Sequence, residues 1–328
     1  MGDVAMTVPV VHSFALQHPE MRITVLTRKI YKPLYAWAPS NVDVMGVDLK
    51  QYGGVTGLER LFREVNKRRF DAVADLHDVL RTKYLRTRFR LSGVPVAVID
   101  KGRSEKHALI GHGCDRAALK PMFERYVDVL RALGFRTEVT FERVFDPKHE
   151  NFKPLELRIG RKPAGQRWIG IAPFAAHEGK IYPLPMMEKV VRMLASQGDR
   201  VFLFGAGEKE KSILESWAAQ NIQSVCGQLG GLYNEMLLMS KLDVMLAMDS
   251  ANMHIAALTA TPVVSIWGAT HPKAGFTPWN QPMDRILQID DLTCRPCSIY
   301  GNKPCQFGDQ RCMTRITPEE IVRKINGI

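Results

Sequence analysis

Short apolar runs alternate with segments of helical spacing along most of this chain. In the second half the strand-like runs are 168–172, 200–204, 243–248 and 262–267, and the helical segments are 185–197, 208–219 and one that begins near Met253. This alternation is typical of βαβ units, in which crossover helices join parallel strands. The sequence therefore predicts an α/β fold built on doubly wound parallel sheets.

The first half repeats this rhythm, with strand-like runs at 22–27, 72–76 and 94–99 and helical spacing at 57–68 and 118–133. Gly2 and Asp3 have the character of a turn that follows a strand, and a helical pattern continues from them to about residue 18. A doubly wound domain begins with a central strand, and none precedes Gly2. Either Met1 is an internal methionine or the domain lacks a core strand; we expect a truncated start, so that the first domain lacks its first strand.

The length of 328 residues is more than one small core requires, so two Rossmann-like domains are expected. We predict a first domain at 1–155 and a second at 156–328. The stretch 146–166, rich in Pro, Lys and Gly, is the expected linker. The second domain would end with a Cys-rich segment at 294–312 and a terminal helix.

The chain is basic, with a formal net charge of +11. This balance favours anionic partners such as nucleic acid, anionic lipid or acidic sugars, and charge alone does not choose among them. No run approaches the roughly 18 to 20 apolar residues of a membrane span. The first twenty residues contain Asp3 and Glu20 and do not resemble a secretory signal. We therefore expect a cytoplasmic protein.

The strongest local signal for function is the segment that follows the strand-like run ending at Met248. Asp249 and Ser250 are favourable turn and N-cap residues, and a helix with His254 in its first turn then begins. Free N–H groups and the helix dipole make such an N-terminus suited to a diphosphate. A plain capped helix with a packed histidine would have the same spacing, so both interpretations stay open.

Three other polar loops follow predicted strands. Lys180 ends the first, where it could neutralise a leaving diphosphate or simply be a solvated lysine. The second has Gly205-Ala-Gly207 followed by Glu208, an acid that could accept ribose hydroxyls, although the full dinucleotide fingerprint is absent. The third contains Thr270. All of these loops fall beyond the carboxyl ends of strands, where open α/β sheets bind ligands.

Two features of the first half could serve an acceptor. Asp3 could take a proton from an attacking hydroxyl, although a turn aspartate that caps a helix has the same pattern. Residues 60–90 contain ten Lys and Arg against four Asp and Glu. They form either a solvated helix face or a cradle for phosphate and carboxylate groups. No nucleic-acid-binding module accompanies this charge, so nucleic acid is not expected.

Four cysteines lie close together, at Cys294, Cys297, Cys305 and Cys312. In a reducing compartment they would be thiols or metal ligands rather than disulfides. Their spacing differs from paired Cys-x2-Cys knuckles, so free or packed thiols are the expectation and a structural zinc is the alternative. No cluster of carboxylates and histidines has the spacing of a catalytic metal site.

Taken together, these short motifs resemble glycosyltransferase family 9, the ADP-heptose:lipopolysaccharide heptosyltransferases, over nearly the whole chain. The resemblance rests on 1–9, 75–81, Lys180, 204–208, 249–254, 268–270 and the late Cys-x-Pro-Cys cluster. It implies a GT-B architecture, in which two Rossmann-like domains face each other across a cleft. Many family members have Gly where this chain has Ala251.

The resemblance also implies a function and a role for each site residue. The reaction would be an inverting, metal-independent transfer of a heptose-like sugar from an ADP-sugar to an acidic lipopolysaccharide-core acceptor, with no cofactor. Asp3 would be the general base and Lys180 the cation on the donor phosphates. The remaining donor contacts would come from Glu208, Asp249, Ser250, Ala251, His254 and Thr270.

The resemblance also suggests partners and a place in the cell. Residues 60–90 would meet the anionic, lipid-linked acceptor, and the protein could contact the inner face of the inner membrane peripherally. Two other functions stay open: a nucleotide-sugar epimerase on the same fold, and a nucleotide-sugar-binding protein without catalysis. An epimerase would consume donor without any acceptor, and a binder would have no turnover.

Overall fold

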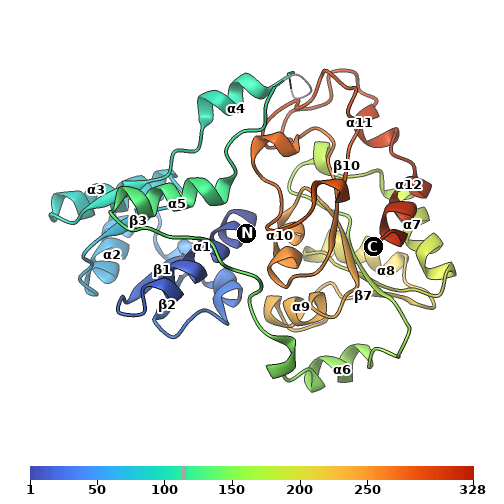
Figure 1. The fold of residues 1–328 in the computed structure, drawn as a ribbon, viewed down its shortest axis with the longest axis horizontal. Coiled ribbons are helices and arrows are strands. Elements are labelled where there is room, and N and C mark those ends of the chain that lie inside the picture. The colour runs from blue at the N-terminus through green and yellow to red at the C-terminus, as the bar shows by residue number, and fades with distance from the viewer. Residues whose placement is uncertain (113–115) are drawn as a thin grey trace. The chain divides into compact units, whose positions relative to one another are not determined.

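The computed structural model of the protein describes residues 1–112 and 116–328 (Figure 1). Cys114 lies outside the described residues. The described chain divides into two structural units. Unit 1 contains Met1, 3–103 and 120–141, and unit 2 contains Gly2, 104–119 and 142–328. The predicted domain limits, 1–155 and 156–328, stay a prediction.

Unit 2 is built on a parallel sheet of six strands with the order β10-β9-β8-β5-β6-β7. The strands are β5 (Trp168–Ala172), β6 (Arg200–Leu203), β7 (Ile222–Ser224), β8 (Val244–Met248), β9 (Val263–Ile266) and β10 (Ile286–Leu287). Every residue of β5, β8 and β9 is buried. Strands covered on both faces are continuous apolar runs, which is why the sequence pattern identified them.

Helices cover both faces of this sheet (Figure 1). Alternate strand residues such as Ile171 and Leu246 enter one core with α7 (Leu184–Ser196) and α12 (Pro318–Asn326). Helix α10 (Ala251–Leu258) packs on β8 and β9 and lies beside α9 (Leu232–Met239). The remaining helices of the unit are α6 (Lys153–Ile159), α8 (Gly207–Ser216) and α11 (Arg311–Thr314), together with most of α4 (Arg103–Leu109).

Unit 1 contains two separate parallel sheets of two strands each. One pairs β1 (Ile23–Arg28) with β2 (Val42–Val47), and the other pairs β3 (Val73–Asp75) with β4 (Val96–Val98). Its helices are α1 (Gly2–Gln17), α2 (Gly54–Asn66), α3 (Leu80–Leu91) and α5 (Met122–Ala132). No strand in the described part of the unit joins the two sheets by hydrogen bonds; the lack of a first strand stays a prediction.

The structure corrects two expectations about particular segments. The stretch 146–166, expected as a linker, contains α6, and Leu155 and Ile159 of that helix are buried. Leu155 and Ile159 are four positions apart, so they share one face of the helix and pack inward despite the Pro and Lys around them. Strand β2 was not among the predicted strands, because Asp43 interrupts its apolar pattern.

Candidate active site

The predicted loops of unit 2 meet at the carboxyl edge of its sheet. The chain enters at β5, runs outward through β6 and β7, and then returns to β8 on the other side of β5. The ends of β5 and β8 are in register at Ala172 and Ala247, and the ends of β8 and β9 at Met248 and Ile266. Such a reversal of strand order is the place where open α/β sheets bind ligands.

Three side chains from these loops form one hydrogen-bonded group. Lys180, at the end of a short 3-10 turn (Glu178–Lys180), places Nζ 3.0 Å from Asp249 Oδ2. Thr270, which follows β9, donates through Oγ1 to the same carboxylate oxygen at 2.8 Å. The side chains of Lys180 and Asp249 are only 15% and 8% exposed, and Thr270 is buried. The group can therefore present a held ammonium to an anion in a weakly hydrated setting.

Directly after Asp249, helix α10 presents its N-terminus. Ser250 is the N-cap residue, but its side chain makes no capping bond to the helix. The Ser250 hydroxyl oxygen is buried and has no hydrogen-bond partner among the described residues. Buried hydroxyls normally have partners, so this one is a candidate ligand contact. Ala251 begins the helix, and His254 in its first turn is buried.

Glu208 is not bonded to this group; it lies in the first turn of α8 and is exposed. The carboxylate that organises the turn is Glu210, whose Oε2 accepts from the Ala206 amide at 2.7 Å. Glu208 is therefore not used in capping α8, and its role toward a ribose stays a prediction.

In unit 1, Asp3 lies in the first turn of α1 and faces His77. His77 Nε2 and Asp3 Oδ2 are 3.6 Å apart, and the two side chains are 52% and 63% exposed. The polar contact with His77 is the main cause that lowers the pKa of Asp3; partial burial acts against it, and the Met1 amine and Lys101 add to it. Asp3 is thus ionised at neutral pH and can accept a proton.

The turn that carries His77 is held by buried charged side chains that were not among the predicted site residues. Asp75 Oδ1 accepts from the amides of His77 and Asp78 at 3.0 and 2.9 Å. Burial opposes the charge on Asp78, but Arg86 and Arg103 hold the pKa of that carboxyl below its usual value. In the sequence, the signal for this turn was a group of two acids, Asp75 and Asp78, and two arginines, Arg86 and Arg103. The acids lie within the 75–81 motif, and the arginines follow it.

Some arginines of the basic stretch 60–90 form ion pairs within the protein. Arg86 bonds Asp78 at 2.7 Å, and Arg88 bonds Glu59 at 2.9 Å. Arg81 and Arg90 of α3 are exposed and make no ion pair within residues 1–112 and 116–328. The free part of the basic surface is therefore smaller than the residue count suggests.

The four late cysteines are free thiols, with Cys312 buried and the other three partly buried. Burial, together with the neighbouring thiols, raises the pKa of Cys312 to about 11, although Arg295 opposes this. The described residues contain no group of three or more His, Cys, Asp or Glu side chains that could hold a metal ion. The zinc alternative for these cysteines therefore has no support in this structure.

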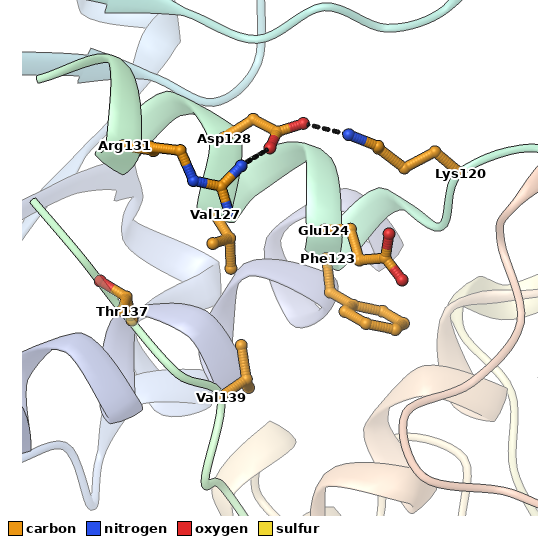
Figure 2. Close-up of a pocket in the computed structure, with 8 residues that line it drawn as sticks. All are labelled: Lys120, Phe123, Glu124, Val127, Asp128, Arg131, Thr137 and Val139. Atoms are coloured by element: carbon orange, nitrogen blue, oxygen red, sulfur yellow. Dashed lines mark hydrogen bonds and ion pairs between the residues drawn. The ribbon is translucent and has the colours of Figure 1, made fainter.

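A surface hollow of about 300 Å³ in unit 1 does not coincide with any predicted site residue (Figure 2). It is lined by Lys120, by residues of α5 and by Thr137 and Val139, and Asp128 bonds Lys120 and Arg131 there. No helix in the described part of the chain is both long enough and apolar enough to cross a bilayer.

A lysine, a carboxylate and a helix N-terminus at the switch point of a parallel sheet define a class: α/β proteins that bind phosphorylated ligands. The model of glycosyltransferase family 9 (heptosyltransferase) matches residues 58–305, and the chain belongs to this family. It is a glycosyltransferase, and the α/β GT-B fold expected from the sequence is confirmed.

Known proteins of this kind resemble the chain along much of its length. Lipopolysaccharide heptosyltransferase 2 of Escherichia coli strain K12 is 22% identical over 351 residues, covering 100% of this chain and 95% of the relative. Lipooligosaccharide heptosyltransferase 2 of Campylobacter jejuni is 27% identical over 198 residues, 56% of each chain. The structure of E. coli ADP-heptose lipopolysaccharide heptosyltransferase II has a TM-score of 0.71 at 17% identity, covering 99% of this chain and 95% of that chain.

Proposed function

We propose that the protein transfers a heptose-like sugar from an ADP-sugar to a hydroxyl of an acidic lipopolysaccharide-core acceptor, with inversion and without a metal ion. The observation that carries this proposal is the Lys180–Asp249–Thr270 group beside the N-terminus of α10. Family membership favours transfer over epimerisation and over binding alone.

The leaving group in this reaction is a nucleoside diphosphate. As the bond from the anomeric carbon to the phosphate oxygen breaks, negative charge grows on the diphosphate. The Lys180 ammonium, the N–H groups at Ala251 and the Ser250 hydroxyl would stabilise that charge. Fixed protein charges and dipoles of this kind can supply what a divalent cation supplies in other enzymes, which is the reason for proposing metal independence.

The attacking group is an acceptor hydroxyl. Asp3 would take its proton as the new bond to the anomeric carbon forms opposite the leaving diphosphate, so the configuration at that carbon inverts. The ionised state of Asp3 supports this role, because the low pKa that His77 maintains leaves the carboxylate free to accept.

The other predicted donor residues have less specific support. Asp249 would hold sugar hydroxyls through its second oxygen, since Oδ2 is already shared by Lys180 and Thr270. His254 would contact a phosphate, and Glu208, exposed at the start of α8, would accept from the ribose hydroxyls. The exposed arginines of α3 would meet the anionic acceptor at the cytoplasmic face of the inner membrane.

The proposal is tested with the full chain, ADP-heptose and a lipopolysaccharide-core acceptor that lacks the heptose. ADP release and the glycosylated product are measured by chromatography and mass spectrometry. We expect product only when both substrates are present, and undiminished rates in the presence of a chelator. Donor conversion without acceptor would instead indicate an epimerase, and donor binding without ADP release would indicate a binding protein.

Asp3→Asn distinguishes a loss of the catalytic base from a loss of donor binding. The variant is expected to lose turnover by about 10²- to 10⁴-fold while the Kd for ADP stays within about twofold of the parent. Asp146→Asn, in an exposed turn, is the matched control and should leave both values unchanged. A variant of Asp3 with full turnover would contradict the assignment of the base.

A further inference from the structure

The segment 295–301, between the first and third of the four late cysteines, lies against the predicted donor site of unit 2. A Cβ placed on Gly301 would come within 2.5 Å of Lys180 Cγ and 2.8 Å of Lys180 Cδ. A Cβ placed on Gly179 would come within 3.0 Å of the Gly301 carbonyl oxygen. The backbone at Gly301 therefore touches the stem of Lys180 and leaves no room for a side chain.

Gly301 also has a backbone conformation that favours glycine, with φ of 73°. Gly301 is buried, so its backbone is closely packed and does not form an exposed turn. Because a closely packed backbone resists displacement, it directs the ammonium of Lys180 toward Asp249 instead of toward solvent. The position of this cation thus depends on a residue more than a hundred positions away in the sequence.

Arg295 braces the turn that carries Thr270, the other residue bonded to the Asp249 carboxylate. Its side chain is 1% exposed and donates to the carbonyl oxygens of Gly268, Trp267 and Thr270 at 2.5, 2.8 and 2.8 Å. The amide of Cys297 donates to the Ala269 carbonyl at 2.8 Å. Each carbonyl from 267 to 270 is therefore bound by this segment.

These bonds fix the turn that carries Thr270. The turn is also tied to the Lys180 loop, because the Ala269 amide donates to the Gly179 carbonyl at 2.9 Å. A guanidinium with several fixed donors is well suited to such bracing, since its planar fork loses little freedom per bond. The segment 295–301 thus contacts both residues that share the Asp249 carboxylate.

We propose that residues 295–301 are a positioning element of the donor site, in which Gly301 sets the place of Lys180 and Arg295 sets the place of Thr270. The ligand class is the diphosphate of the nucleotide-sugar, and the inference rests on the proposed role of Lys180. Neither Gly301 nor Arg295 contacts the reacting atoms in this proposal; both act through other residues.

Gly301→Ala tests the proposal, and Gly308→Ala is a matched control. Both glycines lie in the Cys-rich segment and both have φ of 73°, so alanine is strained by the backbone to a similar degree at each. A Cβ at Gly308 meets nothing within 4 Å, whereas one at Gly301 meets Lys180. We expect Gly301→Ala to raise the Kd for ADP at least tenfold by calorimetry, and Gly308→Ala to change it less than twofold.

A double variant shows whether the effect passes through Lys180. Lys180→Ala removes the stem that the new methyl group would strike. Adding Gly301→Ala to Lys180→Ala is therefore expected to change the Kd for ADP by less than twofold. If Gly301→Ala alone fails to fold, the double variant is expected to fold, and its failure to fold would overturn the proposal.

The outcomes separate this inference from the proposed function. If Lys180→Ala leaves ADP binding unchanged, the proposed role of Lys180 is wrong and the positioning element has nothing to position. If Lys180→Ala weakens binding and Gly301→Ala behaves like Gly308→Ala, only the positioning proposal fails. Arg295→Lys keeps the positive charge but loses the planar guanidinium with its several donors. We expect it to raise the donor KM at least fivefold with the acceptor KM unchanged. Equal changes in both KM values would contradict the positioning role of Arg295.

Discussion

Lys180 Nζ lies 3.0 Å from Asp249 Oδ2, so the cation expected to meet the donor is already paired with a carboxylate. Pairing holds the flexible lysine in one place and satisfies a charge that is only 15% exposed. A bound diphosphate would share the ammonium with Asp249 rather than find it unpaired. This pairing makes the lysine a preorganised contact, because little side-chain entropy remains to be lost on binding.

The first prediction concerns removal of that cation. Lys180→Met keeps most of the side-chain volume and deletes the charge, so the diphosphate loses a charge-assisted contact. Such contacts contribute about 1.5 to 3 kcal/mol, and we expect the Kd for ADP to rise about 10- to 100-fold. Titration calorimetry measures it. Lys189→Met, on an exposed position of α7, should have no effect; equal losses in the two variants would contradict the prediction.

The second prediction concerns the pH dependence of catalysis. The pKa of Asp3 is lowered chiefly by its polar contact with His77, against the effect of burial, and further by the Met1 amine and Lys101. A base with a lowered pKa loses activity only when pH falls through that low value. Replacing His77 by Ala should therefore move the acid limb of kcat/KM to higher pH.

The measurement is a profile of kcat/KM against pH for the parent and His77→Ala. His77→Gln, which can still donate a hydrogen bond to the carboxylate, should move the limb less than His77→Ala does. His149→Ala is the control, since His149 pairs with Asp146 on an exposed turn. An acid limb at the same pH in His77→Ala and the parent would refute the coupling.

The third prediction concerns stability. Burial, aided by Arg295 and Lys273 and opposed by Asp290, lowers the pKa of His271 from 6.5 to about 4. Between these two pH values the unfolded chain binds a proton at this residue and the folded chain does not. The free energy of unfolding should therefore fall as pH decreases from 6.5 to 4, by up to about 3 kcal/mol from this residue.

Urea unfolding at several pH values in this range measures the slope. In the structure, His271 Nδ1 accepts from the Lys273 amide at 3.2 Å. His271→Asn offers a carbonyl oxygen as acceptor and has no titration there, so its unfolding free energy should depend less on pH. If the parent and His271→Asn lose stability in parallel, the group responsible is another one.

The fourth prediction concerns the acceptor. Arg81 and Arg90 are exposed on α3, and reversing both charges should repel an anionic substrate. We expect Arg81→Glu/Arg90→Glu to raise the KM for the acceptor at least tenfold at low ionic strength, with the donor KM unchanged. Higher salt should reduce the difference, because it screens exposed charges. The same reversal at Arg143 and Lys148, which are exposed elsewhere, should leave the acceptor KM within about twofold of the parent.

Much of unit 2 could be predicted because its strands are covered on both faces. Trp168–Ala172 was expected at its observed limits, and the helix expected at 185–197 lies at Leu184–Ser196. Unit 1 was harder to predict, since Val73–Asp75 and Val96–Val98 are short and only partly buried. A weak apolar pattern does not define where such strands end.

The sequence by itself determined the α/β class and the polar loops after the strands, because periodicity and helix N-terminal chemistry are local properties. Only the tertiary structure decided which side chains meet. Asp249 and Thr270 share a hydrogen bond because parallel pairing brings the ends of β8 and β9 together. Gly301 packs on Lys180 through a contact between distant segments, and no spacing in the sequence encodes such a contact.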